Sequence, residues 1–261
     1  MMMSTTRNCV VSAAASSTSS AQRVCIIGAG AAGLAALQVF KNELQVTCFE
    51  RSGTVGGAWA YAKEDNPMYD SLRTNLPKEI MAFSKNFPFR SDLPSFLHHT
   101  DVETYLTSFA RDQDLNECIR LSTSVTCATF VYSMEEKKFV WKIKYQNASN
   151  NDDIDLTENY DALIVANGHF RAPNVPIIPG QHHFKGIISH SYDYKNPESF
   201  LQQEPTTAAK RVKTCLVVGG KSSGTVSQAT RTVKQTHCKI QDIRHDMIMI
   251  DMRHIGVYCI I

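Results

Sequence analysis

Two glycine-rich turns are the residues of this chain best suited to chemistry. The first runs from Gly28 to Gly33 with the pattern Gly-x-Gly-x-x-Gly, and the second runs from Gly219 to Gly224 as Gly-Gly-Lys-Ser-Ser-Gly. Each follows a short apolar run and precedes a stretch able to form a helix. The first glycine of such a turn permits a tight bend, the second lets a pyrophosphate approach the backbone, and the third lets helix and strand pack closely. Two such turns predict two bound dinucleotides that exchange electrons.

An acidic residue supports the first turn as a nucleotide site. Glu50 lies twenty residues beyond Gly30, at the end of the next apolar run. A carboxylate there can accept hydrogen bonds from an adenosine ribose, and its charge disfavours a 2′-phosphate, so FAD or NAD fits better than NADP. The alternative is a solvated strand end. Gly56 and Gly57 then predict backbone that crosses a flavin nucleotide, and Trp59 either covers the cofactor or belongs to the core.

The second turn departs from the pattern because Lys221 occupies the place of the second glycine. A side chain at this place crowds a pyrophosphate. Ser222 and Ser223 can nevertheless hydrogen-bond to phosphate, and Lys221 can supply positive charge. An ordinary strand-to-helix turn is the alternative interpretation.

The pattern of apolar residues predicts the elements that position these turns. Strands at residues 24–27 and 45–50 enclose a helix at residues 31–41, which is a βαβ unit. Thr100 and Glu103 form a capping-box pattern that starts a second helix. Strands at 124–132 and 138–146 precede a polar loop at 147–159, a strand at 160–166, an extended proline-rich linker, a strand at 213–218 and a helix at 225–234. The fold class is therefore α/β, with two Rossmann-like dinucleotide-binding domains of which the second is incomplete.

Composition narrows the class of protein. The 261 residues are 43% hydrophobic and 20% charged with a formal net charge of +2, typical of a soluble globular protein without bulk attraction to nucleic acid. No apolar run is long enough to span a membrane. The eight cysteines include no Cys-x-x-Cys pair, so neither a metal site nor the dithiol of a disulfide or quinone reductase is expected. We expect a reducing, cytoplasmic location. The Ser-, Thr- and Ala-rich residues 1–21 predict a disordered leader, with an organelle transit segment as the alternative.

Four further segments resemble the flavin-containing monooxygenase family, in particular the branch that includes plant glucosinolate S-oxygenases. They are residues 71–83, residues 160–170, residues 184–194 and the second glycine turn, and the resemblance covers roughly residues 22–230. Phe-x-Gly-x-x-x-His-x-x-x-Tyr, from Phe184 through His190 to Tyr194, is the pattern that identifies the family. The related Baeyer–Villiger monooxygenases usually have Trp at the last position, so Tyr194 favours soft heteroatoms over ketones as substrates.

The resemblance implies an FAD-binding domain at 22–172, a linker at 173–210 that senses NADPH, and a partial NADPH-binding domain with a divergent tail at 211–261. It also implies that NADPH and O₂ are used to oxygenate a small amine or thioether. Asn75, beside the flavin and the nicotinamide, is the implied catalytic residue, because its amide can donate a hydrogen bond to the oxygenated flavin.

The expected cofactor-binding residues come partly from the patterns and partly from the resemblance. Around the first site they are Gly28, Ala29, Gly30, Ala31, Ala32, Gly33, Glu50, Arg51, Gly57, Ala58, Trp59, Thr74, Asn75 and Leu76, and around the second they are Gly219, Gly220, Lys221, Ser222, Ser223 and Gly224.

The chain also departs from the family. Val226 stands where the family usually has Asp, and after about residue 239 the sequence no longer follows the family pattern. Family members are nearly twice as long, so we expect a C-terminally truncated chain. A non-catalytic fragment that binds FAD or NADP is therefore the alternative function.

Overall fold

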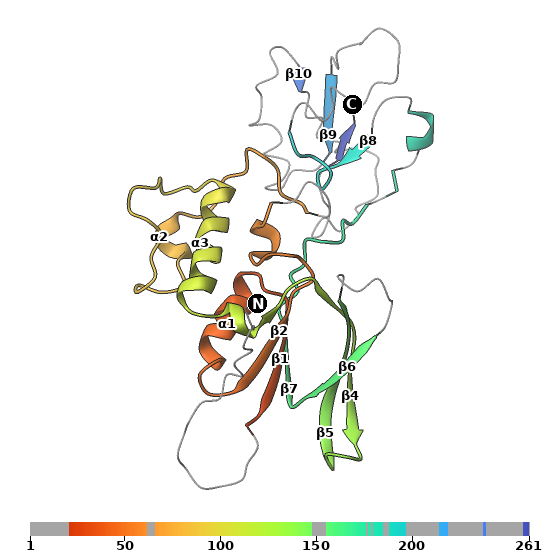
Figure 1. Ribbon diagram of the computed structural model, residues 1–261. Helices are drawn as coiled ribbons and strands as arrows, with labels where there is room; N and C mark the ends of the chain where they lie inside the picture. Colours follow the sequence, from red (N-terminus) through yellow and green to blue (C-terminus); the bar gives the residue numbers. More distant parts are fainter. Residues whose placement is uncertain are drawn as a thin grey trace, which may run out of the picture. The chain divides into compact units, whose positions relative to one another are not determined.

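The computed structural model describes residues 21–61, 66–147, 155–175, 177–178, 180–184, 188–196, 214–218, 237–238 and 258–260 (Figure 1). The chain divides into two compact units. One contains Met1–Gly57 with Leu106–Asn167, and the other contains Ala58–Tyr105 with Gly168–Ile261. Residues 58–105 thus group with the C-terminal part. The functional domain boundaries at residues 172 and 210 stay predictions.

The first unit is built on a parallel sheet with the strand order β3-β2-β1-β7. Its strands are β1 (Arg23–Ile27), β2 (Gln45–Phe49), β3 (Ile119–Arg120) and β7 (Ala162–Val165), and helix α1 (Ala31–Phe40) connects β1 to β2. β1 pairs with β2 from Arg23↔Gln45 to Ile27↔Phe49. The short run RVCII forms a central strand because its middle residues are apolar and buried, as parallel strands require. The expected βαβ unit is confirmed.

An antiparallel sheet covers the face of the parallel sheet opposite α1 (Figure 1). It has the order β4-β5-β6, with β4 (Thr123–Ser133), β5 (Lys138–Asn147) and β6 (Leu156–Tyr160). The two sheets share an apolar core. Its buried members are Cys25, Phe49, Ile143, Tyr145 and Tyr160. Phe49 packs on Tyr145 at a ring distance of 4.8 Å and meets Tyr160 edge-on at 6.1 Å.

The sequence predictions around β6 were partly wrong. Part of the expected loop at 147–159 forms β6, and the expected strand at 160–166 is divided, since Tyr160 ends β6 and β7 begins at Ala162. Asp161 causes the division. Its carboxylate accepts the backbone N–H of Arg23 at 2.7 Å, and its own N–H donates to the carbonyl of Arg23 at 2.8 Å. The chain therefore passes from one sheet to the other at this residue.

The second unit contains α2 (Lys78–Met81) and the first part of α3 (His99–Asp112), within which the division between the units falls. Tyr105 organises this part, because its ring stacks on Phe89 at 3.8 Å and its hydroxyl accepts from Phe83 N–H and donates to the carbonyl of Phe87. The apolar residues that recur at helical spacing along this helix are all buried. They are Val102, Tyr105, Leu106, Phe109 and Ala110.

The predicted cap of α3 was misplaced. The helix begins at His99, so Thr100 lies inside its first turn. Asp101 accepts the backbone N–H of His98 at 3.1 Å, which is the reciprocal bond of a capping box formed two residues earlier than expected. The sequence pattern pointed to Thr100 and Glu103, whereas the acidic residue that makes the capping bond is Asp101, which lies nearer the start of the helix.

A further sheet in the second unit has the order β10-β9-β11-β8. Its strands are β8 (Ile188–His190), β9 (Thr214–Val218), β10 (His237–Cys238) and β11 (Tyr258–Ile260). β9 confirms the strand expected at 213–218, and it pairs in parallel with β10, as a βαβ unit requires. The expected helix at 225–234 lies outside the described residues.

The short helices η1 (Gly57–Trp59), η2 (Asn116–Cys118) and η3 (Gln181–His183) complete the elements. In the part of the chain that the structure describes, no helix has the length and apolarity needed to cross a membrane.

Candidate functional site

The turn from Gly28 to Gly33 joins β1 to α1. The backbone conformation of the turn and its neighbouring atoms require glycine at the first position. Gly28 adopts a φ of +100°, which disfavours any residue with a side chain. Its N–H donates to the carbonyl of Phe49 at 2.8 Å. An added Cβ would lie 2.6 Å from the carbonyl oxygen of Ala166. Gly28 therefore makes the tight bend that the sequence predicted.

The third glycine allows α1 to pack closely on the turn. A Cβ at Gly33 would lie only 1.8 Å from the carbonyl oxygen of Gly28. No rearrangement of side chains can relieve such an overlap, because the contacting atom belongs to the backbone. The prediction that Gly33 permits close packing of helix and strand is confirmed.

The second glycine faces a different neighbour. A Cβ at Gly30 would lie 3.5 Å from the Cα of Gly57, which is an ordinary van der Waals distance. The N–H of Gly56 donates to the carbonyl of Ala29 at 3.0 Å. The paired glycines therefore lie against the first turn, and the fold itself leaves room for a side chain at Gly30.

The start of α1 offers free donors next to this space. Gly30 is the N-cap residue and makes no side-chain capping bond, and the first turn contains no acidic residue. Leu34 N–H donates to the carbonyl of Gly30 at 2.9 Å as the helical ladder begins. The preceding N–H groups of Ala31, Ala32 and Gly33 come too early in the helix for an intrahelical acceptor. These donors and the helix dipole make a site suited to an anion.

Glu50 ties the turn to the end of β2. The residue is only 5% exposed, which rules out a solvated strand end. One carboxylate oxygen accepts the N–H of Ala29 at 2.7 Å and the other accepts the N–H of Ser52 at 2.8 Å. Each oxygen keeps a further lone pair, so both can still accept a hydroxyl. Arg51, the neighbouring expected residue, is exposed.

The remaining residues expected at the first site belong to the second unit. Thr74 is buried and pinned to Leu97 by two hydrogen bonds, from Thr74 N–H to the carbonyl of Leu97 at 2.9 Å and from Leu97 N–H to Thr74 Oγ1 at 3.0 Å. Asn75 and Leu76 are exposed beside it. Ala58 is exposed and Trp59 is half-buried, so Trp59 is not core. Their part in cofactor binding stays a prediction.

The second glycine turn cannot be placed. Residues Gly219, Gly220, Lys221, Ser222, Ser223 and Gly224 lie outside the described residues, which resume at β10. Within the identifying pattern, Gly186 also lies outside them, whereas His190 and Tyr194 are described. His190 ends β8, and burial lowers its pKa against the opposing effect of Asp193.

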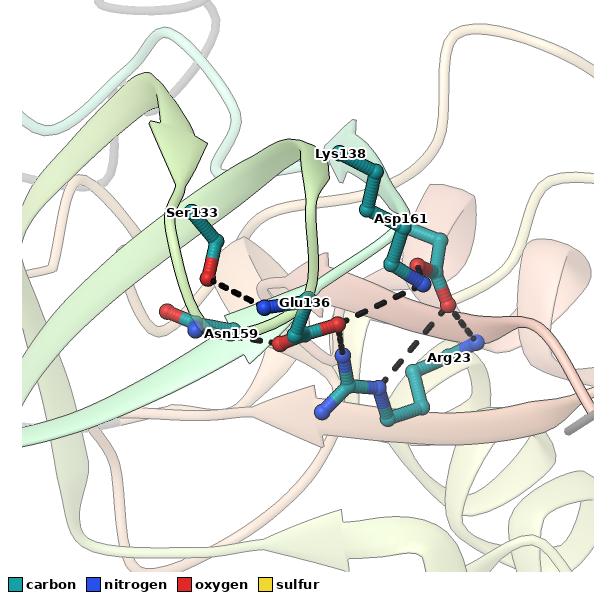
Figure 2. Close-up of polar contacts among 6 residues, drawn as sticks. All are labelled: Arg23, Ser133, Glu136, Lys138, Asn159 and Asp161. Carbon is teal, nitrogen blue, oxygen red and sulfur yellow. Dashed lines mark hydrogen bonds and ion pairs between the residues drawn. The ribbon is translucent and has the colours of Figure 1, made fainter.

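The sequence did not predict one cluster of charged residues (Figure 2). Arg23, at the start of β1, donates to Glu136 at 2.6 Å and lies 3.8 Å from Asp161. Lys138 joins both carboxylates, at 3.3 Å and 2.6 Å. Asn159 donates to Glu136 at 3.1 Å. The cluster fastens the β4–β5 hairpin to the parallel sheet, and no sequence pattern could reveal it because its members are far apart in the chain.

A polar hollow of ≈ 180 Å³ lies between the two sheets of the first unit. Glu158 on its wall accepts from Arg120 at 2.7 Å, from Tyr145 at 2.6 Å and from Tyr160 at 2.7 Å. Burial alone would raise the pKa of Glu158, but these hydrogen bonds outweigh it and lower the pKa. Both oxygens of this carboxylate have hydrogen-bond partners inside the protein. We therefore interpret the hollow as part of the contact between the two sheets. Within the described ranges, no group of His, Cys, Asp and Glu is arranged to hold a metal ion.

Comparison with known proteins agrees with this geometry. The family model described as flavin-binding monooxygenase-like matches residues 21–241. The N-oxide-forming dimethylaniline monooxygenase 4 of Homo sapiens is 35% identical over 224 residues, which cover 82% of this chain and 37% of the relative. The monooxygenase FMO GS-OX5 of Arabidopsis thaliana is 36% identical over 204 residues, which cover 69% of this chain and 42% of the relative.

A solved structure gives the same result. The S-allyl-L-cysteine S-oxygenase of Allium sativum matches with a TM-score of 0.60 and 30% identity, covering 70% of this chain and 44% of that one. The chain thus spans less than half the length of these relatives. It belongs to the flavin-binding monooxygenase-like family.

Proposed function

We propose that this chain binds FAD at the Gly28–Gly33 turn and acts as an NADPH- and O₂-dependent monooxygenase of soft nitrogen or sulfur nucleophiles. One observation carries the proposal. The donors at the start of α1, the backbone at Gly30 that carries no side chain, and the buried carboxylate of Glu50 meet at one place. A pyrophosphate needs the first two features and a ribose needs the third.

The residues present fit FAD better than NADPH at this place. The N–H groups of Ala31, Ala32 and Gly33 would hold the pyrophosphate, and the carboxylate of Glu50 would accept the ribose hydroxyls. A 2′-phosphate next to Glu50 would be repelled, since both groups are anionic. NADPH would therefore bind at the second turn, where Lys221 and the two following serines can contact phosphate.

When bound and reduced, FAD supplies the activation of O₂. The protein's own contribution is position, hydrogen bonding and exclusion of water. Asn75 is exposed on a loop whose neighbour Thr74 is pinned, so its amide is free to donate a hydrogen bond from a fixed backbone.

The substrate class follows from the relatives and from one residue. The names of the human and garlic relatives point to N-oxidation and S-oxygenation. Tyr194, in place of the Trp of ketone-oxidising enzymes, agrees with a soft nitrogen or sulfur nucleophile. Free thiols at Cys25, Cys48 and Cys127 suit a reducing compartment, and we propose the cytoplasm.

A second candidate is a non-catalytic FAD-binding fragment. The observation in its favour is the share of the relatives that the chain spans, 37% and 42% for the two curated relatives above. Such a fragment would bind FAD through the same residues of the first unit but would not be reduced by NADPH.

One experiment separates these functions. The purified chain is incubated with FAD, desalted and examined by visible absorption, and NADPH is then added without oxygen. Bound flavin that NADPH bleaches, and that forms an N-oxide or S-oxide from a tertiary amine or S-allyl-L-cysteine when air is admitted, supports the monooxygenase. Bound flavin that NADPH leaves oxidised supports the fragment. A colourless protein that leaves FAD unbound at micromolar concentration overturns both.

A further inference from the structure

We propose that Lys195 and Asn196, directly after the identifying pattern, form a clasp on residues 66–70 and thereby position the loop that carries Asn75. The role assigned to Asn75 rests on the proposed function, whereas the clasp itself rests on contacts within the second unit. Lys195 and Asn196 are thus positioning residues, which act through the loop rather than on a substrate.

Lys195 holds the first part of the clasp. Its ammonium donates to the carbonyl of Asn66 and to the carbonyl of Met68 at 3.2 Å. Asn66 and Met68 are 6% and 4% exposed, so these carbonyls have little access to water. The Asn66 amide also donates to the carbonyl of Ala60 at 2.6 Å and accepts Met68 N–H at 2.7 Å. The ammonium therefore donates hydrogen bonds to two carbonyls of a buried turn.

Asn196 holds the second part. Its amide donates to Asp70 Oδ2 at 2.9 Å, and Asp70 N–H donates to the carbonyl of Lys195 at 2.9 Å. Tyr61 donates to the other oxygen of Asp70 at 2.5 Å. The hydrogen bonds from Tyr61 and Asn196 lower the pKa of Asp70, so the carboxylate stays ionised as an acceptor. Segments that are 126 residues apart in the chain are joined here.

The start of α3 also holds this segment. His98 Nε2 lies 2.7 Å from the carbonyl oxygen of Asp70, and His99 N–H donates to the carbonyl of Leu72 at 3.1 Å. Arg73 forms an antiparallel bridge with His98. Asp70 is thus the point at which the clasp and the helix start both contact the loop.

Asn75 follows within five residues of this point. Its neighbour Thr74 is fixed to Leu97 by the two bonds described above, so the backbone from Asp70 to Thr74 is supported at each end. A displacement of Lys195 and Asn196 removes their hydrogen bonds at Asp70 and leaves that end held only by Tyr61 and His98 among the contacts described above. The pattern from Phe184 to Tyr194 directly precedes the clasp, so Lys195 and Asn196 connect that pattern to the loop that carries Asn75.

The experiment compares Lys195→Met and Asn196→Ala with matched controls at exposed residues, Lys142→Met on β5 and Asn86→Ala. Amide hydrogen exchange is measured by mass spectrometry over residues 66–77 of the purified chain without cofactor. Loss of one of these hydrogen bonds weakens the local structure, so we expect exchange in this segment to become about tenfold faster in both clasp variants. The controls and Lys195→Arg, which keeps the cation, should exchange at the wild-type rate. If Lys195→Met fails to fold, Asn196→Ala decides the result, because the hydrogen bond from the Asn196 side chain to Asp70 lies at the surface. Wild-type exchange rates over residues 66–77 in the folded variants would overturn the clasp.

A second measurement tests positioning. In the FAD-loaded chain, Asn196→Ala should release about tenfold more hydrogen peroxide per NADPH oxidised while the flavin content stays unchanged, because a displaced Asn75 no longer supports oxygen transfer. Unchanged peroxide release, with faster exchange, would overturn positioning and leave a structural clasp. Hydrogen exchange needs neither cofactor nor turnover, so failure to bind FAD would overturn the proposed function alone.

Discussion

The substitution Gly30→Ala should weaken FAD binding while leaving the fold intact. Gly30 has a φ of −75° and a ψ of −172°, which any residue adopts. An alanine Cβ would meet only Gly57, with its nearest atom at 3.5 Å. In the family pattern, however, this is the position at which the pyrophosphate approaches the backbone. Folding and cofactor binding therefore make different demands on this residue.

The expected effect of Gly30→Ala on FAD binding is larger than its expected effect on the free energy of unfolding. Alanine is a poorer N-cap than glycine, but it restricts the unfolded chain by about 0.4–1 kcal/mol, so the two effects nearly cancel and the free energy of unfolding should change by less than about 1 kcal/mol. A hydrogen bond to a charged phosphate contributes about 1.5–3 kcal/mol, so the Kd for FAD should rise about 10- to 150-fold. Gly33→Ala is the contrasting variant, because its Cβ would lie 1.8 Å from Gly28 O and should destabilise the fold by about 3 kcal/mol or more.

The assay combines two measurements on each variant. Thermal unfolding followed by circular dichroism, without FAD, reports stability. Quenching of FAD fluorescence on titration reports the Kd. A folded Gly30→Ala protein that binds FAD as tightly as the wild type would refute the placement of the pyrophosphate at this turn.

Three further predictions concern the first unit. Glu50→Gln should reduce stability by about 1–3 kcal/mol in thermal unfolding and weaken FAD binding, because its amide group would face a buried N–H of Ala29 or Ser52; unchanged values for both would show that neither N–H needs the carboxylate. The folded-state pKa of Glu158 lies below its unfolded value. Its contribution to the free energy of unfolding is therefore complete above about pH 4.5 and is lost as pH falls through the lowered pKa. Glu158→Gln should therefore flatten the acid side of a stability-against-pH curve, and an unchanged slope there would contradict this. Cys127 is exposed, whereas burial raises the pKa of Cys25 to about 12, so N-ethylmaleimide at pH 8 should label Cys127 in the folded protein well before Cys25, as peptide mapping can check.

The sequence predicted the first βαβ unit well because its determinants are local. β1, α1 and β2 lie within 27 residues, and the glycines that join them are required by backbone atoms of the same unit. β6 was missed because the run LTENY is polar, and its stability comes from pairing with β5 and from hydrogen bonds of Glu158 rather than from an apolar pattern. The cap of α3 was displaced because His98 and Asp101, which form it, do not match the Ser/Thr-x-x-Glu/Gln pattern that Thr100 and Glu103 match.

The two kinds of site residue also differ in what a sequence can reveal. A glycine such as Gly28 or Gly33 is informative because its position excludes every other residue, so a pattern of glycines carries the geometry of the turn. Lys195 is different, because it donates to backbone carbonyls 127 and 129 residues away, and every residue type has a carbonyl. Lys78 is a second example, since its ammonium donates to the carbonyls of Arg90, Ser91 and Leu93 while the residue is 9% exposed. A cation that satisfies backbone carbonyls leaves no partner pattern in the sequence, so the residues that hold the Asn75 loop become visible only when the chain is folded.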